Sequence, residues 1–394
     1  MAELVFSLMT SDVPNATIEA LMLEFRARTG TQVQLQPLSW DIAWNEMVKI
    51  AIYRSGPDVS EIGATWMSDL AGMGSIRPLT MPELRTLGPL EDFIPAMWQS
   101  VNLPNSDDIW GIPWMMDTRL LFYRRDLLAQ AGIDEAEAFV SFESLETTLR
   151  RLQEAGVEIS WVVPTRRNWI TLHNLATWVW AHGGDFVSAD GKTLLVNTPE
   201  ARAGFRGYFG LGRFMPPQVH HLTTFESDDC FGQGRAAVTL SGMWLWQNAY
   251  LTPELRANIG MVLPPGIPYV GGSYLVVWEY AHNVRDALKL IRFLTDARAM
   301  QRYALEVGKL PARFSALSEV AAPFNTSVET LVRRLGEGRS LHGVPLWGMI
   351  EDRLANTLRD IWRDVLESPE ADIEAIVERH LQVLTRGLEL TLRG

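Results

Sequence analysis

The sequence predicts an α/β protein of two domains, and three observations support this prediction. The chain has 394 residues, whereas a single hydrophobic core stops growing near ~250–300 residues. Its composition is 47% hydrophobic and 21% charged, which is close to the norm of folded globular proteins. In the first third of the chain, short apolar runs alternate with helical patterns, and this order is typical of parallel strands joined by helices.

The first elements can be followed in chain order. Residues 4–9 form an apolar run that predicts a buried strand. Apolar residues at helical spacing over 18–25, closed by Gly30, predict a helix and its end. Alternating residues over 33–36 predict a second strand, and the pattern over 44–51 predicts a second helix.

A third short strand is predicted over residues 59–62. In parallel α/β sheets, ligands bind beyond the carboxyl ends of the strands. Those ends are followed here by residues 10–12, 39–41 and 63–66. The order of elements alone therefore places candidate binding residues in these three segments.

The rest of the chain has a less regular order. Extended patterns cover residues 154–163 and 274–278. Helical patterns cover residues 141–152, 168–181, the stretch that begins at the N-cap candidate Thr198, 287–294, 300–307 and most of the chain after Phe314.

Charge and composition narrow the class of partner. The net charge of −12 disfavours nucleic acid and anionic membrane surfaces, because an acidic protein repels phosphate groups. No apolar run approaches the ~18 residues of a spanning helix. The single cysteine, Cys230, excludes a disulfide within the chain. The first residues lack a basic region and an apolar stretch, so we expect a cytosolic protein or a secreted one whose signal peptide has been removed.

Motifs of catalysis are not supported. Residues 191–193 lack the glycine that a phosphate-binding loop needs five positions earlier, where Phe186 stands. Residues 232–237 fit a dinucleotide-binding pattern, but no strand precedes them. The seven histidines show no metal-binding spacing, and no nucleophile elbow occurs. We predict no catalytic residue, no metal site and no cofactor, while a pair of carboxylates acting as in a glycosidase stays an alternative.

Six groups of short segments share one family likeness. In chain order they are Gly56–Val59, Gly111–Leu127 with Ala131–Asp134, Gly183–Phe186 with Asn197–Ala201, Phe231–Val238 with Ser241–Trp244, Gly271–Tyr274, and Gly308–Arg313. Together, over about residues 1–315, they resemble family 1 extracellular solute-binding proteins of carbohydrate ABC importers.

The resemblance implies a two-lobe periplasmic-binding-protein fold that is type II-like, each lobe being a sheet flanked by helices. The expected N-terminal lobe is residues 1–113 plus 270–314, and the C-terminal lobe is residues 114–269 plus 315–394. Hinge segments near Pro113, Val270 and Phe314 would let the lobes close around a ligand. The resemblance also implies a periplasmic protein that delivers its ligand to the permease subunits of an ABC importer. We expect a monomer, because a protein that docks on a permease must present both lobes to it.

Sugar recognition needs flat aromatic faces and groups that hydrogen-bond to hydroxyls. The strand ends and the family-like segments supply both. The expected ligand-binding residues are Asp12, Trp40, Asp41, Trp44, Thr65, Trp66, Trp114, Asp117, Trp244, Gly271, Gly272, Tyr274, Arg313 and Trp347. Each tryptophan has packing in a core as its alternative, since the chain contains 15 of them.

A neutral mono- or oligosaccharide is the leading expectation, because carboxylates accept strong hydrogen bonds from hydroxyl groups. Arg313 and the pair Arg166-Arg167 leave open a polyol or an anionic sugar derivative, such as a phosphate or sulfonate ester. A glycoside-processing enzyme and a sensory binding protein are the remaining alternatives.

Overall fold

The computed structural model describes residues 3–9, 15–102, 107–320, 328–368 and 370–392. The chain divides into two compact units. The first unit is Met1–Asp117, Val270–Ala322 and Arg339–Gly348, and the second is Thr118–Tyr269, Pro323–Gly338 and Met349–Gly394. These boundaries differ from the expected lobe limits at 113 and 314, and the segment Arg339–Gly348 falls in the first unit rather than the second.

A six-stranded sheet forms the centre of the first unit, in the order β10-β4-β9-β3-β1-β2. Its strands are β1 (Glu3–Met9), β2 (Gln32–Leu38), β3 (Val59–Gly63), β4 (Ile112–Thr118), β9 (Val270–Val277) and β10 (Leu310–Pro311). Strand β1 is parallel to both β2 and β3, whereas β9 is antiparallel to β3. The predicted parallel start of the sheet is therefore confirmed.

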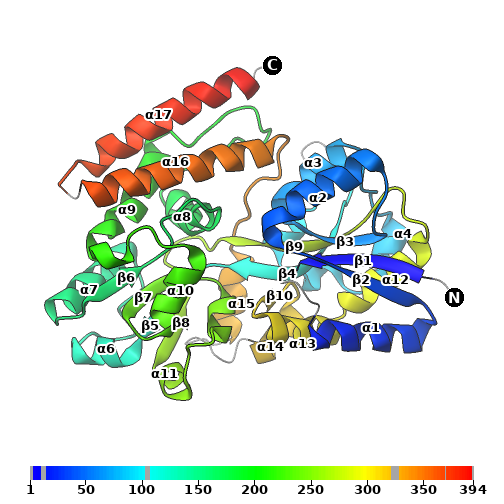
Figure 1. Cartoon of the computed structure of the whole chain (residues 1–394), viewed down its shortest axis with the longest axis horizontal. Helices are drawn as coiled ribbons and strands as arrows, with labels where there is room; N and C mark the ends of the chain where they lie inside the picture. Colours follow the sequence, from blue (N-terminus) through cyan, green and yellow to red (C-terminus); the bar gives the residue numbers. More distant parts are fainter. Residues whose placement is uncertain (1–2, 10–14, 103–106, 321–327, 369, 393–394) are drawn as a thin grey trace. The chain divides into compact units, whose positions relative to one another are not determined.

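Helices cover both faces of this sheet. They are α1 (Ala16–Thr29), α2 (Trp40–Tyr53), α3 (Met67–Gly72), α4 (Met81–Leu84), α5 (Pro95–Gln99), α12 (Val284–Leu294), α13 (Ala297–Val307) and α14 (Leu317–Val320). Helices α1 and α2 lie on opposite sides of the sheet (Figure 1), because the chain steps outward from β1 to β2 and then back across β1 to β3. Helix α1 packs beside α12 and α13.

The ends of α1 follow from its sequence. Asn15 accepts a hydrogen bond from the backbone N–H of Ile18 and caps the start of the helix. Gly30 adopts a φ of 76° at the predicted end, a conformation that glycine reaches without steric penalty.

The second unit is built on a four-stranded sheet in the order β6-β7-β5-β8. Its strands are β5 (Leu120–Arg124), β6 (Ile159–Val162), β7 (Ala236–Ser241) and β8 (Ile259–Val262). Its helices are α6 (Arg125–Gln130), α7 (Phe142–Glu154), α8 (Ile170–Ala181), α9 (Pro199–Phe209), α10 (Thr224–Gly232), α11 (Pro253–Ala257), α15 (Val328–Gly336), α16 (Trp347–Glu367) and α17 (Ile373–Leu392).

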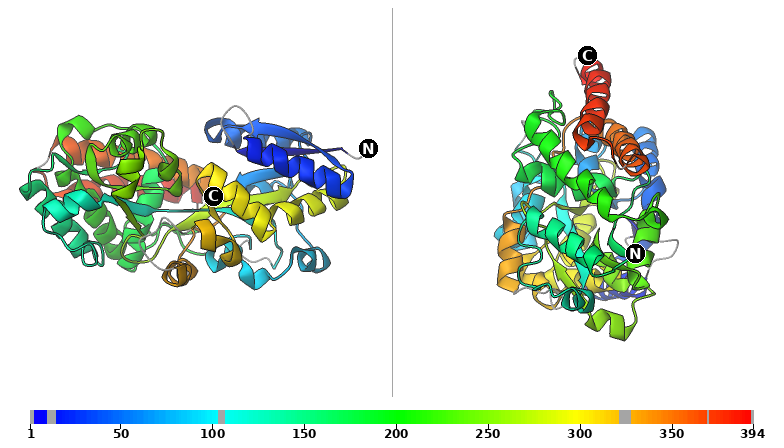
Figure 2. Two further views of the ribbon diagram at one scale, coloured as in Figure 1. Left: turned by 90° about the horizontal axis from the view of Figure 1, so that it is seen from below. Right: turned by 90° about the vertical axis from the view of Figure 1, so that its left-hand side faces the viewer.

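Two long helices, α16 and α17, run side by side in the views of Figures 1 and 2. Asp364 on α16 accepts hydrogen bonds from Arg379 and His380 on α17, at 2.6 and 2.8 Å. Helix α17 also packs against α9 through the ion pair between Arg202 and Glu378. Among the described residues, no helix is long and apolar enough to cross a membrane.

Candidate functional site

Three tryptophans gather at the carboxyl ends of β2 and β3 in the first unit. Trp40 and Trp44 lie at the start of α2, which follows β2, and Trp66 ends the short 3-10 helix Ala64–Trp66, which follows β3. The centroid of the Trp66 ring lies 5.6 Å from that of Trp40 and 5.7 Å from that of Trp44. All three side chains are half-buried, and we call this group the tryptophan shelf.

The shelf packs against Gly63, the last residue of β3. A Cβ atom at this position would lie 3.6 Å from both the Trp40 and the Trp66 rings. This is an ordinary van der Waals distance, so both rings lie directly against the last residue of β3. The shelf is packed directly on the end of the sheet, where ligands of α/β proteins bind.

An ion pair that the sequence analysis did not identify lies beside the shelf. The Lys309 ammonium group is 5.1 Å from the centroid of the Trp40 ring and 3.6 Å from the Glu61 carboxylate. Glu61 is buried, and its other carboxylate oxygen accepts the backbone N–H of Met9 at 2.7 Å. Nothing in the sequence links Glu61, within a strand, to Lys309, so only the fold brings them together.

A second aromatic group forms in the second unit around Trp244, which follows β7. Its indole N–H donates to Asp228 at 2.8 Å. The guanidinium carbon of Arg119 lies 4.7 Å from the centroid of the Trp244 ring and 5.9 Å from that of Tyr269. Trp244 is half-buried, whereas Arg119 is only 1% exposed. The indole is thus held by a carboxyl group at its edge and a cation over its face.

Burial sets the protonation of this second group. Asp228 is 4% exposed, and burial raises the pKa of its carboxyl to about 6, although the Trp244 hydrogen bond and the charge of Arg119 act in the opposite direction. His173 stacks on Tyr269 at 4.5 Å. Burial, followed by the charge of Arg119, holds the pKa of His173 well below its ordinary value. The sequence analysis expected Trp244 but not Arg119, Asp228 or Tyr269, because no local spacing connects them.

Three of the expected ligand-binding residues are fully buried in the first unit. Trp114 is 0% exposed and stacks on Tyr303, with ring centroids 4.7 Å apart. Tyr274 is also 0% exposed, and its hydroxyl shares a hydrogen bond with Ser100. Trp347 is buried to the same extent. For Trp114 and Trp347, burial agrees with the alternative of packing in a core, and Tyr274 is buried in the same way.

The two expected glycines lie in β9, inside the sheet of the first unit. Gly272 has a φ of 138°, and a Cβ atom there would lie 2.1 Å from the Met115 carbonyl oxygen of β4. The close backbone approach expected at this position is therefore made with a neighbouring strand. Gly271 is buried beside it.

The other expected residues take varied places. Thr65 is half-buried within the 3-10 helix before Trp66, and Asp117 is half-buried near the end of β4. Asp12 lies outside the described residues. Asp41 contributes its backbone to the first turn of α2, but its side chain also lies outside the description.

Arg313 is buried and holds a loop of the first unit. It is 3% exposed, and its guanidinium carbon lies 3.8 Å from the centroid of the Phe93 ring. Its hydrogen-bond acceptors, at 2.7 to 3.3 Å, are the carbonyl oxygens of Leu87, Pro89 and Thr295 and the carboxylate of Asp92. These bonds use all three guanidinium nitrogens within the protein, so the expected contact with a ligand gives way to a structural role.

We expect Arg313→Lys to lower stability and leave ligand affinity unchanged. Lysine keeps the charge but cannot reproduce the planar fork that reaches several acceptors at once. The loss should be about 1–2 kcal/mol of the free energy of unfolding, measured by urea denaturation. A fall in ligand affinity with unchanged stability would contradict the structural role.

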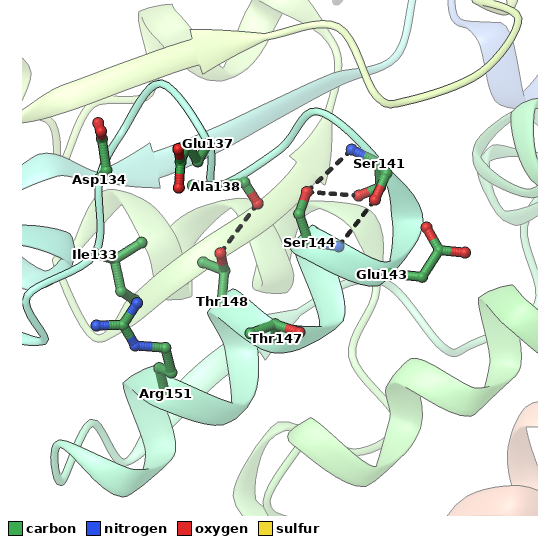
Figure 3. Close-up of a pocket in the computed structure, with 10 residues that line it drawn as sticks. All are labelled: Ile133, Asp134, Glu137, Ala138, Ser141, Glu143, Ser144, Thr147, Thr148 and Arg151. Carbon is green, nitrogen blue, oxygen red and sulfur yellow. Dashed lines mark hydrogen bonds between the residues drawn. The ribbon is translucent and has the colours of Figure 1, made fainter.

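A surface hollow of about 380 Å³ lies in the second unit between α7 and the segment that precedes it (Figure 3). Several of its polar side chains bond to nearby backbone. Ser141 and Ser144 cap α7 reciprocally, Thr148 donates to the Ala138 carbonyl, and Arg151 donates to the Gly132 carbonyl. The hollow contains none of the expected site residues, and its contacts are those of a seam between packed elements.

Comparisons with known proteins agree on one family and one fold. A family model described as bacterial extracellular solute-binding protein matches residues 10–301. The diacetylchitobiose binding protein DasA of Streptomyces coelicolor is 21% identical over 348 residues, which cover 84% of this chain and 78% of the relative. The sn-glycerol-3-phosphate-binding periplasmic protein UgpB of Shigella flexneri is 20% identical over 411 residues, covering 94% and 89%.

A solved structure extends the likeness to the whole fold. The sugar-binding protein MalE from Xanthomonas citri superposes with a TM-score of 0.83 at 20% identity, covering 100% of this chain and 98% of that one. At this level of identity the likeness establishes the fold. The expected two-lobe α/β fold is confirmed.

Proposed function

Since the chain belongs to the family of bacterial extracellular solute-binding proteins, we propose that it captures a neutral sugar and delivers it to the permease of an ABC importer. The observation that carries the sugar assignment is the tryptophan shelf. Three half-buried indole rings lie at the carboxyl ends of β2 and β3, the strands on either side of β1, where flat faces can contact the C–H side of a sugar ring.

The second unit supports the same proposal through Trp244. Its ring is half-buried and held in place by two neighbours, Asp228 and Arg119. A fixed aromatic face binds a ligand with little loss of side-chain entropy. Each unit therefore supplies an aromatic platform of its own.

The engagement of the arginines favours a neutral ligand. Arg313 is committed to carbonyl oxygens and Asp92, and Arg119 is fully buried. Arg167, which the sequence analysis considered for an anionic ligand, pairs with Asp352 and donates to Asn356 at 3.0 Å. A phosphate or sulfonate group would require a guanidinium that can turn its donors toward it.

One observation supports an anionic sugar derivative as the second candidate. Lys309 lies against Trp40 of the shelf and its side chain is 22% exposed. Its ammonium group is 3.6 Å from Glu61, a separation long enough for the group to turn toward a phosphate. The similarity to UgpB, whose name specifies sn-glycerol-3-phosphate, is a second reason to test this candidate.

The proposed role is binding without turnover. Neither aromatic group contains a nucleophile paired with a base, and the protein would release its ligand unchanged. We propose that it works in the periplasm as a monomer, with the permease subunits as its protein partner. Nucleic acid and membrane insertion have no part in this proposal.

A panel of ligands tests the proposal through thermal stability. Neutral sugars, polyols, sugar phosphates and sugar sulfonates are added to ligand-free protein, and products are assayed afterwards. A ligand that binds only the folded state raises stability by ~2.7 kcal/mol at a hundredfold excess over its dissociation constant. We expect a large shift with a neutral sugar, unchanged in Lys309→Met. A shift confined to anionic compounds and lost in Lys309→Met would favour the second candidate, and no shift with any compound would reject both.

A further inference from the structure

Asp228 is an unusual residue for its surroundings. It lies on α10 with 4% exposure, and its carboxyl accepts the indole N–H of Trp244 at 2.8 Å. A carboxyl group in this environment is unfavourable, because burial penalises the charged form. An uncharged acceptor would hold the indole without that penalty, so the carboxyl calls for an explanation beyond packing.

The neighbours of Trp244 restrict how its ring can meet a ligand. Arg119 lies over the ring, 4.7 Å from its centroid, and therefore covers one face. Asp228 holds the N–H edge. The Gly242 backbone also packs against the ring, because a Cβ atom there would lie 2.0 Å from Cζ3 of Trp244. Trp244 is nevertheless half-buried rather than buried.

We propose that Asp228 is a positioning residue, which fixes the Trp244 indole so that the exposed part of its ring is presented to the sugar. This inference rests on the proposed function for its ligand, but the orientation of Trp244 can be measured without any ligand. A charge-assisted hydrogen bond holds the ring more firmly than a neutral one, and a ring fixed beforehand loses less entropy on binding.

The charged groups that face Asp228 come from few elements. Arg119 precedes β5, and Asp229 is the next residue on α10. Strand β7 contributes the hydroxyl of Ser241, and β6, which also packs against α10, has no titratable side chain in its sequence Ile159–Val162. Because the pKa of Asp228 is about 6, its charge, and with it the strength of the indole bond, changes between pH 5 and pH 7.5.

Four variants separate positioning from mere packing. Asp228→Leu removes the acceptor, whereas Asp228→Asn keeps an oxygen that accepts the indole N–H. Trp244→Phe removes the donor. Glu226→Gln is the matched control, since Glu226 lies on the same helix and accepts the backbone N–H of Thr223 at 2.7 Å, so its change removes a carboxylate charge from α10 without touching Trp244.

The first measurement is ligand-free. The indole N–H signal of Trp244 is recorded by NMR in protein carrying ¹⁵N-tryptophan and is assigned by its loss in Trp244→Phe. We expect it to be sharp and slow to exchange in the parent, in Asp228→Asn and in Glu226→Gln, and broadened or fast to exchange in Asp228→Leu. An unchanged signal in Asp228→Leu would overturn the proposal, whether or not any sugar is found to bind.

The second measurement is the affinity for the sugar that the panel identifies. At pH 7.5 we expect Asp228→Leu to weaken binding about tenfold and Asp228→Asn to weaken it about threefold, as protonation of the parent does. Asp228→Leu should have no further effect in a Trp244→Phe background. Affinity of the parent should weaken about threefold from pH 7.5 to pH 5, and that of Asp228→Asn should not change. Equal losses in Asp228→Leu and Glu226→Gln would assign the effect to helix stability and overturn the proposal.

Discussion

Trp66→Leu should weaken sugar binding about thirtyfold or more while the protein stays folded. Trp66 is the central ring of the shelf and contacts both Trp40 and Trp44. Leucine keeps apolar packing in the half-buried space but offers no flat face, and the loss of one such aromatic contact at the centre of a site is worth about 2 kcal/mol or more. Isothermal titration with the sugar identified by the panel measures the change.

A second tryptophan of the same unit provides the control. Trp98 is also half-buried and stacks on Phe93, with ring centroids 5.4 Å apart, but it is not part of the shelf. Trp98→Leu should lower stability about as much as Trp66→Leu and leave the dissociation constant unchanged. If both variants bind the sugar as the parent does, the shelf is a packing cluster and the binding surface of the first unit lies elsewhere.

The tryptophan shelf shows what the order of elements can predict. Parallel strands joined by helices bring their carboxyl ends to one edge of the sheet. Residues after β2 and β3 were therefore expected at this edge, and Trp40, Trp44 and Trp66 gather there. The prediction needed only the positions of strands and helices, which hydrophobic periodicity indicates well in this part of the chain.

For other aromatic residues, the order of elements did not predict which side chains stay available to a ligand. Trp114 and Tyr274 lie on β4 and β9, strands whose residues are buried on nearly every side, so no alternation marks an outward face. The partner that buries Trp114 is Tyr303 on α13, far along the chain. Which tryptophan packs and which stays available depends on such distant contacts, and one sequence does not show them.

The role of Arg313 depended on contacts of the same kind. Its position after Pro311 suggested a group facing a ligand, but three backbone carbonyls and Asp92 surround it in the structure. The sequence of a loop does not show which backbone carbonyls accept hydrogen bonds, because every residue carries a carbonyl group. Asp228 was missed for the corresponding reason, since its partner Trp244 belongs to a different element.

Asp228→Asn should stabilise the protein by up to about 3 kcal/mol at pH 7 and have almost no effect at pH 4. Burial raises the pKa of this carboxyl from 3.8 to about 6 in the folded state, so between these values the folded protein binds the proton that the unfolded chain releases. The contribution of Asp228 to the stability of the parent is therefore highest below pH 4, falls as pH rises to about 6 and stays low above it, at about 1.4 kcal/mol for each pKa unit. Asparagine cannot ionise, keeps an acceptor for Trp244 and removes this fall. Urea unfolding of both proteins at pH 4 and pH 7 measures the difference.

If Arg119 instead compensates the Asp228 charge fully, the substitution would leave a buried cation without its counter-charge, and the variant would be less stable than the parent at pH 7.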